Sequence, residues 1–166
     1  MSPLQFAPLV AEDWSSVRRI LAEGIATGAA TFETEPPSWG EWDEAHLKQC
    51  RLVARHEGEV VGWTALTRYS RRAVYAGVAE ISIYVAEARR NRGVGKALLA
   101  AAVAATEEAG FWTLLAGVFP ENAASRAVHE ACGFREVGVR ERLGKLRGVW
   151  RDVLLFERRS AVRGVD

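Results

Sequence analysis

Within residues 78–85, the apolar residues Ile81, Ile83 and Val85 alternate with Glu80, Ser82 and Tyr84. A period of two is typical of a β-strand with one buried face. Shorter apolar runs bounded by turn residues predict further strands, and residues 57–59 read as a hairpin turn between two of them. The predicted strands are residues 5–10, 51–56, 60–68, 78–85, 113–118, 134–139 and 149–157.

Four of the segments between these strands have features typical of helices. Val17, Ile20 and Leu21 share one face of a helix that Asp13 can cap. Ser38 and Glu41 form a capping box for a short helix toward Gln49. Two more helices are expected over residues 93–109 and 122–131, and Gly133 can end the second in a left-handed cap.

The element order β-α-α-β-β-β-α-β-α-β-β has more strands than helices, and most connections are short. This favours an α/β (α+β) fold, with a mixed, mainly antiparallel central sheet flanked by helices. We expect a single domain over residues 1–160, with residues 161–166 as a frayed tail.

Composition and charge argue against several classes of protein. The 166 residues carry a formal net charge of +1, which provides no field that would draw the protein to nucleic acid or to an anionic membrane. Cys50 and Cys132 lack metal-ligand spacing, so we expect free thiols and no bound metal. The first residues do not resemble a signal peptide, and no run of about 18 apolar residues occurs. We therefore expect a cytoplasmic protein.

Residues 85–96 are the most informative segment, because a strand ends there in a basic turn and two glycines open a long helix. The first turn of a helix offers unpaired N–H groups and the positive end of the helix dipole. Glycine allows close approach of a bulky anion. The segment therefore predicts a pyrophosphate site. Leu98 excludes a dinucleotide fingerprint, which needs a third glycine there, and Ala97 excludes a P-loop, which needs Ser or Thr.

The spacing Arg90-x-x-Gly93-x-Gly95 resembles the cofactor signature of the GNAT superfamily of N-acetyltransferases, and Asn122 to Phe134 resembles a second motif of that family. The resemblance implies that acetyl-CoA is the co-substrate. It also implies that the strand before the loop is splayed from its neighbour and pairs with the pantetheine arm. The implied cofactor-binding residues are Ile83, Tyr84, Val85, Arg90, Asn91, Arg92, Gly93, Val94, Gly95, Lys96, Asn122 and Ser125.

A closer resemblance, over about residues 5–157, is to phosphinothricin and methionine sulfone or sulfoximine acetyltransferases. It implies an enzyme that acetylates the α-amine of a small amino-acid-like substrate, and a homodimer. The segments that carry it are residues 31–36, 72–75, 79–85, 128–134 and 148–152.

Acetyl transfer needs a base, because an α-amine is largely protonated near pH 7. Glu80 is the first candidate, since a carboxylate in an otherwise apolar strand is expensive unless it is used or paired. His129 is the second, since an ordinary histidine pKa suits proton transfer. Each also has a structural interpretation, as a solvent-facing strand residue or a packed helix residue.

Residues for the substrate are expected in the basic loop before the base strand, because an arginine fork binds a carboxylate or phosphinate. Two alternatives stay open. The acceptor could be another amine, such as a protein N-terminus or a polyamine, or the protein could be an acyl-CoA-binding regulator that does not need Glu80. In the basic loop the candidate substrate residues are Arg71, Arg72 and Tyr75, and Phe32 and Trp150 are candidates for the walls of the substrate pocket.

Overall fold

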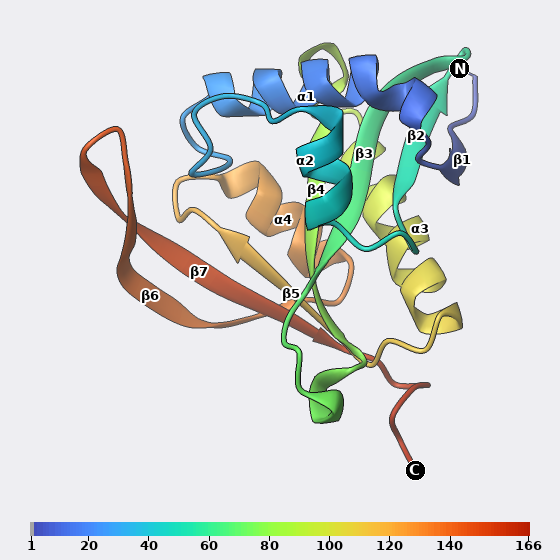
Figure 1. Ribbon diagram of the computed structural model, residues 1–166, viewed down its shortest axis with the longest axis vertical. Helices are drawn as coiled ribbons and strands as arrows, with labels where there is room; N and C mark the ends of the chain where they lie inside the picture. The colour runs from blue at the N-terminus through green and yellow to red at the C-terminus, as the bar shows by residue number, and fades with distance from the viewer. Residues whose placement is uncertain (1) are drawn as a thin grey trace.

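The computed structural model describes residues 2–166, which form a seven-stranded sheet with helices on both faces (Figure 1). The strand order is β1-β2-β3-β4-β5-β7-β6. All neighbours are antiparallel except β4 and β5, which run parallel. The expected mixed, mainly antiparallel sheet is therefore confirmed. The strands are β1 (Gln5–Pro8), β2 (Leu52–His56), β3 (Glu59–Arg68), β4 (Val78–Val85), β5 (Thr113–Val118), β6 (Arg135–Leu146) and β7 (Val149–Arg159).

Helices cover the two faces of the sheet in pairs. One face carries α1 (Trp14–Ala26) and α2 (Trp39–Ala45), and the other carries α3 (Val94–Glu108) and α4 (Ala123–Ala131) (Figure 1). Within residues 2–166, none of the helices has the length and apolar character to cross a membrane. Three short 3-10 helices complete the fold, η1 (Ala11–Asp13), η2 (Ala73–Tyr75) and η3 (Glu87–Arg89).

The predicted caps at Ser38 and Gly133 are confirmed, whereas the predicted cap at Asp13 and the extension of α2 toward Gln49 are wrong, since α2 ends at Ala45. Ser38 and Glu41 form the capping box of α2, and Gly133 adopts a left-handed φ of 85° after α4. Asp13 makes no side-chain cap for α1. Its carboxylate instead pairs with Arg55 on β2 and accepts a hydrogen bond of 3.1 Å from the Val10 N–H, because the 3-10 turn η1 already leads the chain into α1.

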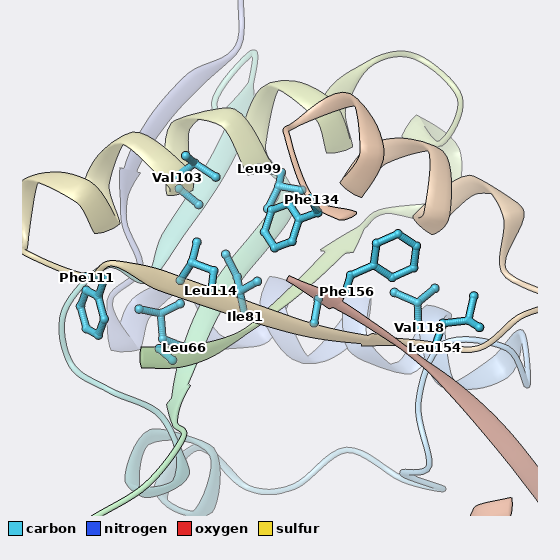
Figure 2. Close-up of a cluster of buried hydrophobic side chains, with 13 residues drawn as sticks. Leu66, Ile81, Leu99, Val103, Phe111, Leu114, Val118, Phe134, Leu154 and Phe156 are labelled. Carbon is cyan, nitrogen blue, oxygen red and sulfur yellow. The ribbon is translucent and has the colours of Figure 1, made fainter. Parts of the chain in front are cut away.

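The two faces of β4 pack into different hydrophobic clusters. Ala79 and Ile81 belong to the large cluster under α3 and α4, together with Leu99 and Phe156 (Figure 2). Since successive strand residues point to opposite faces, Glu80 and Tyr84 project toward the α1 side. The packing of Tyr84 with the α1 cluster agrees with this assignment.

The last two strands form a long hairpin that extends beyond the body of the molecule (Figure 1). The predicted strand over residues 134–139 is too short, since β6 continues to Leu146. Bulges between Glu136 and Gly138 and between Arg140 and Gly144 interrupt its alternation, so no period of two marks its second half. Arg147 and Gly148 both have positive φ and form the two-residue turn.

Candidate active site

The gap between the two parallel strands positions the candidate site. β4 pairs with β5 only from Val78 to Glu80, and beyond this point the described chain gives the facing edge of β4 no strand partner. β3 still pairs with the opposite edge as far as Val85. Figure 1 shows β5 diverging from β4. The backbone groups on the free edge can therefore bind a ligand as a strand would.

A cleft of about 620 Å³ occupies this gap. α1 and the loop after it line one side, and the first turns of α3 and α4 line the other, so the cleft reaches both faces of the sheet. The structure brings together most of the predicted catalytic and cofactor residues here. Those that line the cleft are Glu80, Ile83, Tyr84, Val85, Arg90, Asn91, Gly93, Gly95, Lys96, Asn122, Ser125 and His129.

The loop between β4 and α3 (residues 86–93), which we call the glycine loop, ends in a left-handed turn at the start of α3. Asn91 and Gly93 have φ values of 59° and 81°, which turn the chain sharply into the helix. A Cβ built on Gly93 would meet no atom within 4 Å, so the space beside it is open. At Gly95 the Cβ would lie 3.5 Å from side-chain atoms of Val85 and Val128, so that position is packed instead.

Positive charge surrounds this end of the cleft. Arg89, Arg90 and Lys96 line it, and the Arg90 Nε donates to the Val85 carbonyl at 3.4 Å, which holds the guanidinium beside the end of β4. Arg92 is exposed outside the cleft lining, and the Val94 side chain is buried in the core. With the helix N-terminus, these cations form a site suited to a diphosphate.

Asn122 uses both ends of its side-chain amide within the protein. Its Oδ1 accepts from the Ser125 N–H at 3.1 Å, which caps α4, and its Nδ2 donates to the Ala29 carbonyl at 3.2 Å. Asn122 is therefore the N-cap of α4. Any coenzyme contact by Asn122 must use its remaining hydrogen-bonding capacity.

Glu80 lies on the α1 side of the gap, with its side chain exposed to the cleft. Its Oε1 lies 3.9 Å from the Cβ position built on Gly117, two residues beyond its register partner Leu115 on β5. A methyl group there would be in ordinary van der Waals contact with the carboxylate and would press on Val153, whose Cγ1 lies 3.2 Å away, so a longer side chain would extend into the space beside Glu80. Glycine there leaves Glu80 accessible from the cleft.

His129 is a buried, neutral imidazole on the α3 and α4 side. Its Nδ1 lies 2.7 Å from the Ser125 carbonyl, which only accepts, so Nδ1 carries the proton. Its Nε2 has no partner among the described residues. Burial lowers the pKa of His129 below its ordinary value, and the bond to Ser125 opposes this only in part. Phe134 and Phe156 pack against the ring.

The model of the acetyltransferase (GNAT) family matches residues 14–134. A phosphinothricin N-acetyltransferase from Alcaligenes faecalis is 33% identical over 153 residues, which are 89% of this chain and 78% of that protein. The chain belongs to the acetyltransferase (GNAT) family. It is an enzyme that transfers acetyl groups.

Two further comparisons also find acetyltransferases that are similar to this chain. An L-methionine sulfoximine/L-methionine sulfone acetyltransferase from Pseudomonas paraeruginosa is 29% identical over 119 residues, or 70% of this chain and 69% of that protein. The structure of a GNAT superfamily phosphinothricin acetyltransferase from Sinorhizobium meliloti, in complex with acetyl-CoA, has a TM-score of 0.86 and 28% identity, and covers 98% of this chain and 91% of that chain.

The residues predicted to bind the acceptor lie outside the cleft of the acetyltransferase. Arg71 and Arg72 are exposed in the loop before β4, and the Arg72 guanidinium stacks on Tyr75 with its carbon 5.4 Å from the ring centroid. Phe32 packs edge-on against Phe119, with ring centroids 5.0 Å apart. Trp150 is exposed near the hairpin turn, where the Lys145 ammonium lies 5.0 Å from its ring.

The end of α1 and the loop after it form a wall of the acetyltransferase cleft that the sequence did not predict. Gly24, Thr27 and the Ala29–Ala30 pair line it. Gly24 is needed because a Cβ there would approach the Tyr84 ring to 2.8 Å, and burial raises the pKa of Tyr84 to about 12. No local pattern marks these residues. Within residues 2–166, no group of three or more His, Cys, Asp or Glu side chains is placed to hold a metal ion.

Proposed function

We propose that this acetyltransferase moves the acetyl group of acetyl-CoA directly to the α-amine of a small amino-acid-like substrate of the phosphinothricin, methionine sulfone or methionine sulfoximine type. The observation that carries the proposal is one cleft that joins a cationic helix N-terminus, a splayed strand edge and the carboxylate of Glu80. The names of the relatives support the choice of substrate class.

The described residues fit acetyl-CoA. The N–H groups at the start of α3, with Arg90 and Lys96, would hold the pyrophosphate. The free edge of β4 from Ile83 to Val85 would pair with the pantetheine amides, as a second strand would. Bound there, acetyl-CoA supplies an activated thioester. The backbone N–H groups of the same edge are suited to stabilise negative charge on its carbonyl oxygen.

Glu80 is the better candidate for the base, because the two candidates lie on opposite faces of the sheet. His129 packs with Phe134 and Phe156 under α4, on the same face as α3. Glu80 projects to the α1 side. An acyl chain entering from the glycine loop and crossing the gap would present its thioester toward Glu80. There the carboxylate can take the proton from the amine directly or through one water.

Thiol release from acetyl-CoA tests the proposal. The panel contains phosphinothricin, methionine sulfone, methionine sulfoximine, ordinary amino acids, spermidine and a short peptide with N-terminal alanine. We expect the three amino-acid analogues to give the highest kcat/KM. A preference for spermidine or for the peptide would overturn the assigned substrate class. Absence of turnover with every amine, with acetyl-CoA binding intact, would favour a regulator instead.

A specific observation keeps the peptide in the panel. The Glu80 carboxylate gives the acceptor end of the cleft its negative charge, since the Glu121 carboxylate pairs with Arg151 at 3.2 Å. Arg71 and Arg72 lie outside the cleft. A ribosomal-protein-alanine N-acetyltransferase from Brucella melitensis shares the fold with a TM-score of 0.86 and 27% identity, covering 94% of this chain and 99% of that chain. An acidic acceptor end suits an ammonium group without a neighbouring anion.

The proposed enzyme is a homodimer. Support comes from the projecting β6–β7 hairpin, whose apolar side chains Val139, Leu143, Val149 and Trp150 are more than half exposed. Apolar side chains gathered on one projecting element are typical of an interface. Light scattering at high protein concentration should give twice the monomer mass. A monomer under these conditions would refute the dimer and leave the acetyltransferase assignment unaffected.

A further inference from the structure

Three side-chain hydrogen bonds tie together two loops on either side of the cleft. On β7, the Arg151 Nη1 donates to the Gly28 carbonyl at 2.9 Å, and its Nη2 donates to the Glu121 carboxylate at 3.2 Å. Asn122 Nδ2 donates to the Ala29 carbonyl at 3.2 Å. Gly28 and Ala29 follow α1, whereas Glu121 and Asn122 precede α4. We refer to Arg151, Glu121 and Asn122, with the two carbonyl groups, as the clasp.

Arg151 is held firmly in the clasp. Its side chain is only 18% exposed, and its guanidinium carbon lies 4.3 Å from the ring centroid of the buried Phe119. A planar guanidinium can stack on a ring while it donates to two acceptors in different directions. A lysine at this position would keep the charge but could not keep both bonds and the stacking.

The clasp lies on the Glu80 side of the sheet. Val153, two residues after Arg151, projects to the same face, and its Cγ1 lies 3.2 Å from the Cβ position built on Gly117. The Glu80 Oε1 lies 3.9 Å from that same position. The clasp therefore borders the part of the cleft proposed for the amine. The glycine loop, with its cations, precedes α3 on the opposite face.

We propose that Arg151 is a positioning residue that fixes the wall of the amine site. Its two hydrogen bonds hold residues 27–30 against the start of α4, so that this wall is preformed when the amine arrives. The inference rests on the proposed function, because it assigns Arg151 an effect on the acceptor and none on the coenzyme. Pre-ordering a loop removes an entropic cost that the substrate would otherwise meet on binding.

Steady-state kinetics separate the two substrates. Arg151→Gln should raise KM for the amine by about tenfold, the effect of about 1.4 kcal/mol, while KM for acetyl-CoA stays at the wild-type value. Arg151→Lys should recover part of the loss. Arg135→Gln is the matched control, because Arg135 also pairs with a glutamate at 3.2 Å but lies 68% exposed on β6. This control should leave both KM values unchanged.

Amide hydrogen exchange tests the clasp without relying on activity. Arg151→Gln should speed exchange at residues 28–32 relative to wild type and Arg135→Gln, with the protection of α3 unchanged. If Arg151→Gln fails to fold, Glu121→Gln is a milder variant. It should also speed exchange at residues 28–32. Unchanged exchange, or a rise in KM for acetyl-CoA alone, would overturn the inference. Faster exchange in a protein that acetylates no amine would refute the proposed function and leave the clasp standing.

Discussion

Replacing Gly93 by alanine should weaken acetyl-CoA binding through the geometry of a single residue. Gly93 has a φ of 81°, where an ordinary side chain costs about 1–2 kcal/mol. The added methyl meets no protein atom within 4 Å, so it would occupy open space where the cleft borders α3. We expect coenzyme affinity to fall by at least about tenfold, or about 1.4 kcal/mol.

The far end of the same helix supplies a matched control. Gly110, after α3, has a φ of 94° and also has no atom within 4 Å of an added Cβ, but it does not line the cleft. Gly110→Ala should therefore lose similar stability in urea unfolding, about 1–2 kcal/mol, and bind acetyl-CoA as wild type does. Titration calorimetry measures both affinities. Unchanged affinity in folded Gly93→Ala, or an equal loss in Gly110→Ala, would refute this reasoning.

Three further outcomes are expected. Glu80→Gln should keep coenzyme affinity but lower kcat by about 10²–10⁴-fold, and the pH profile of kcat should lose its ascending limb. If instead His129→Ala alone abolishes turnover, His129 is the base. Burial lowers the pKa of His46 and His129 below 6.5, so the unfolded chain takes up protons first as pH falls. The free energy of unfolding should therefore decrease as the pH falls below about 6.5. His129→Gln should reduce the difference in this free energy between about pH 5 and pH 7.5, measured by urea unfolding. An unchanged difference would contradict this reasoning. Gly24→Ala should displace the Tyr84 ring, which stacks on Trp63 at 4.8 Å, and destabilise the fold by about 1–3 kcal/mol in thermal melts, unlike Gly40→Ala, where a Cβ meets open space.

The features that the sequence predicted well are local. Each depends only on residues that are close together in the chain. Examples are the alternation in β4, the Ser38–Glu41 capping box and the glycines that open α3. The bulges of β6 hid its second half, because an extra residue shifts a strand out of its period.

The parts of the site that could not be predicted depend on contacts between distant residues. Gly24 accommodates Tyr84, and Arg151 reaches the carbonyl of Gly28 across the molecule. The residues next to Arg151 in the sequence, such as the exposed Trp150, do not indicate that its partner is the carbonyl group of Gly28. Arg71 and Arg72 illustrate the converse, since adjacent basic residues suggested an anion site and the fold placed them outside the cleft.

With acetyl-CoA and the amine bound as proposed, a cleft that crosses the sheet offers the two substrates separate entrances. The coenzyme would approach from the side of α3 and α4, and the amine from the side of the α1–α2 loop. Neither then blocks the path of the other, so a ternary complex can form in either order. Double-reciprocal plots should intersect rather than run parallel. Desulfo-CoA should compete with acetyl-CoA but not with the amine, and a molecule that joins both substrates through the gap should bind more tightly than either alone.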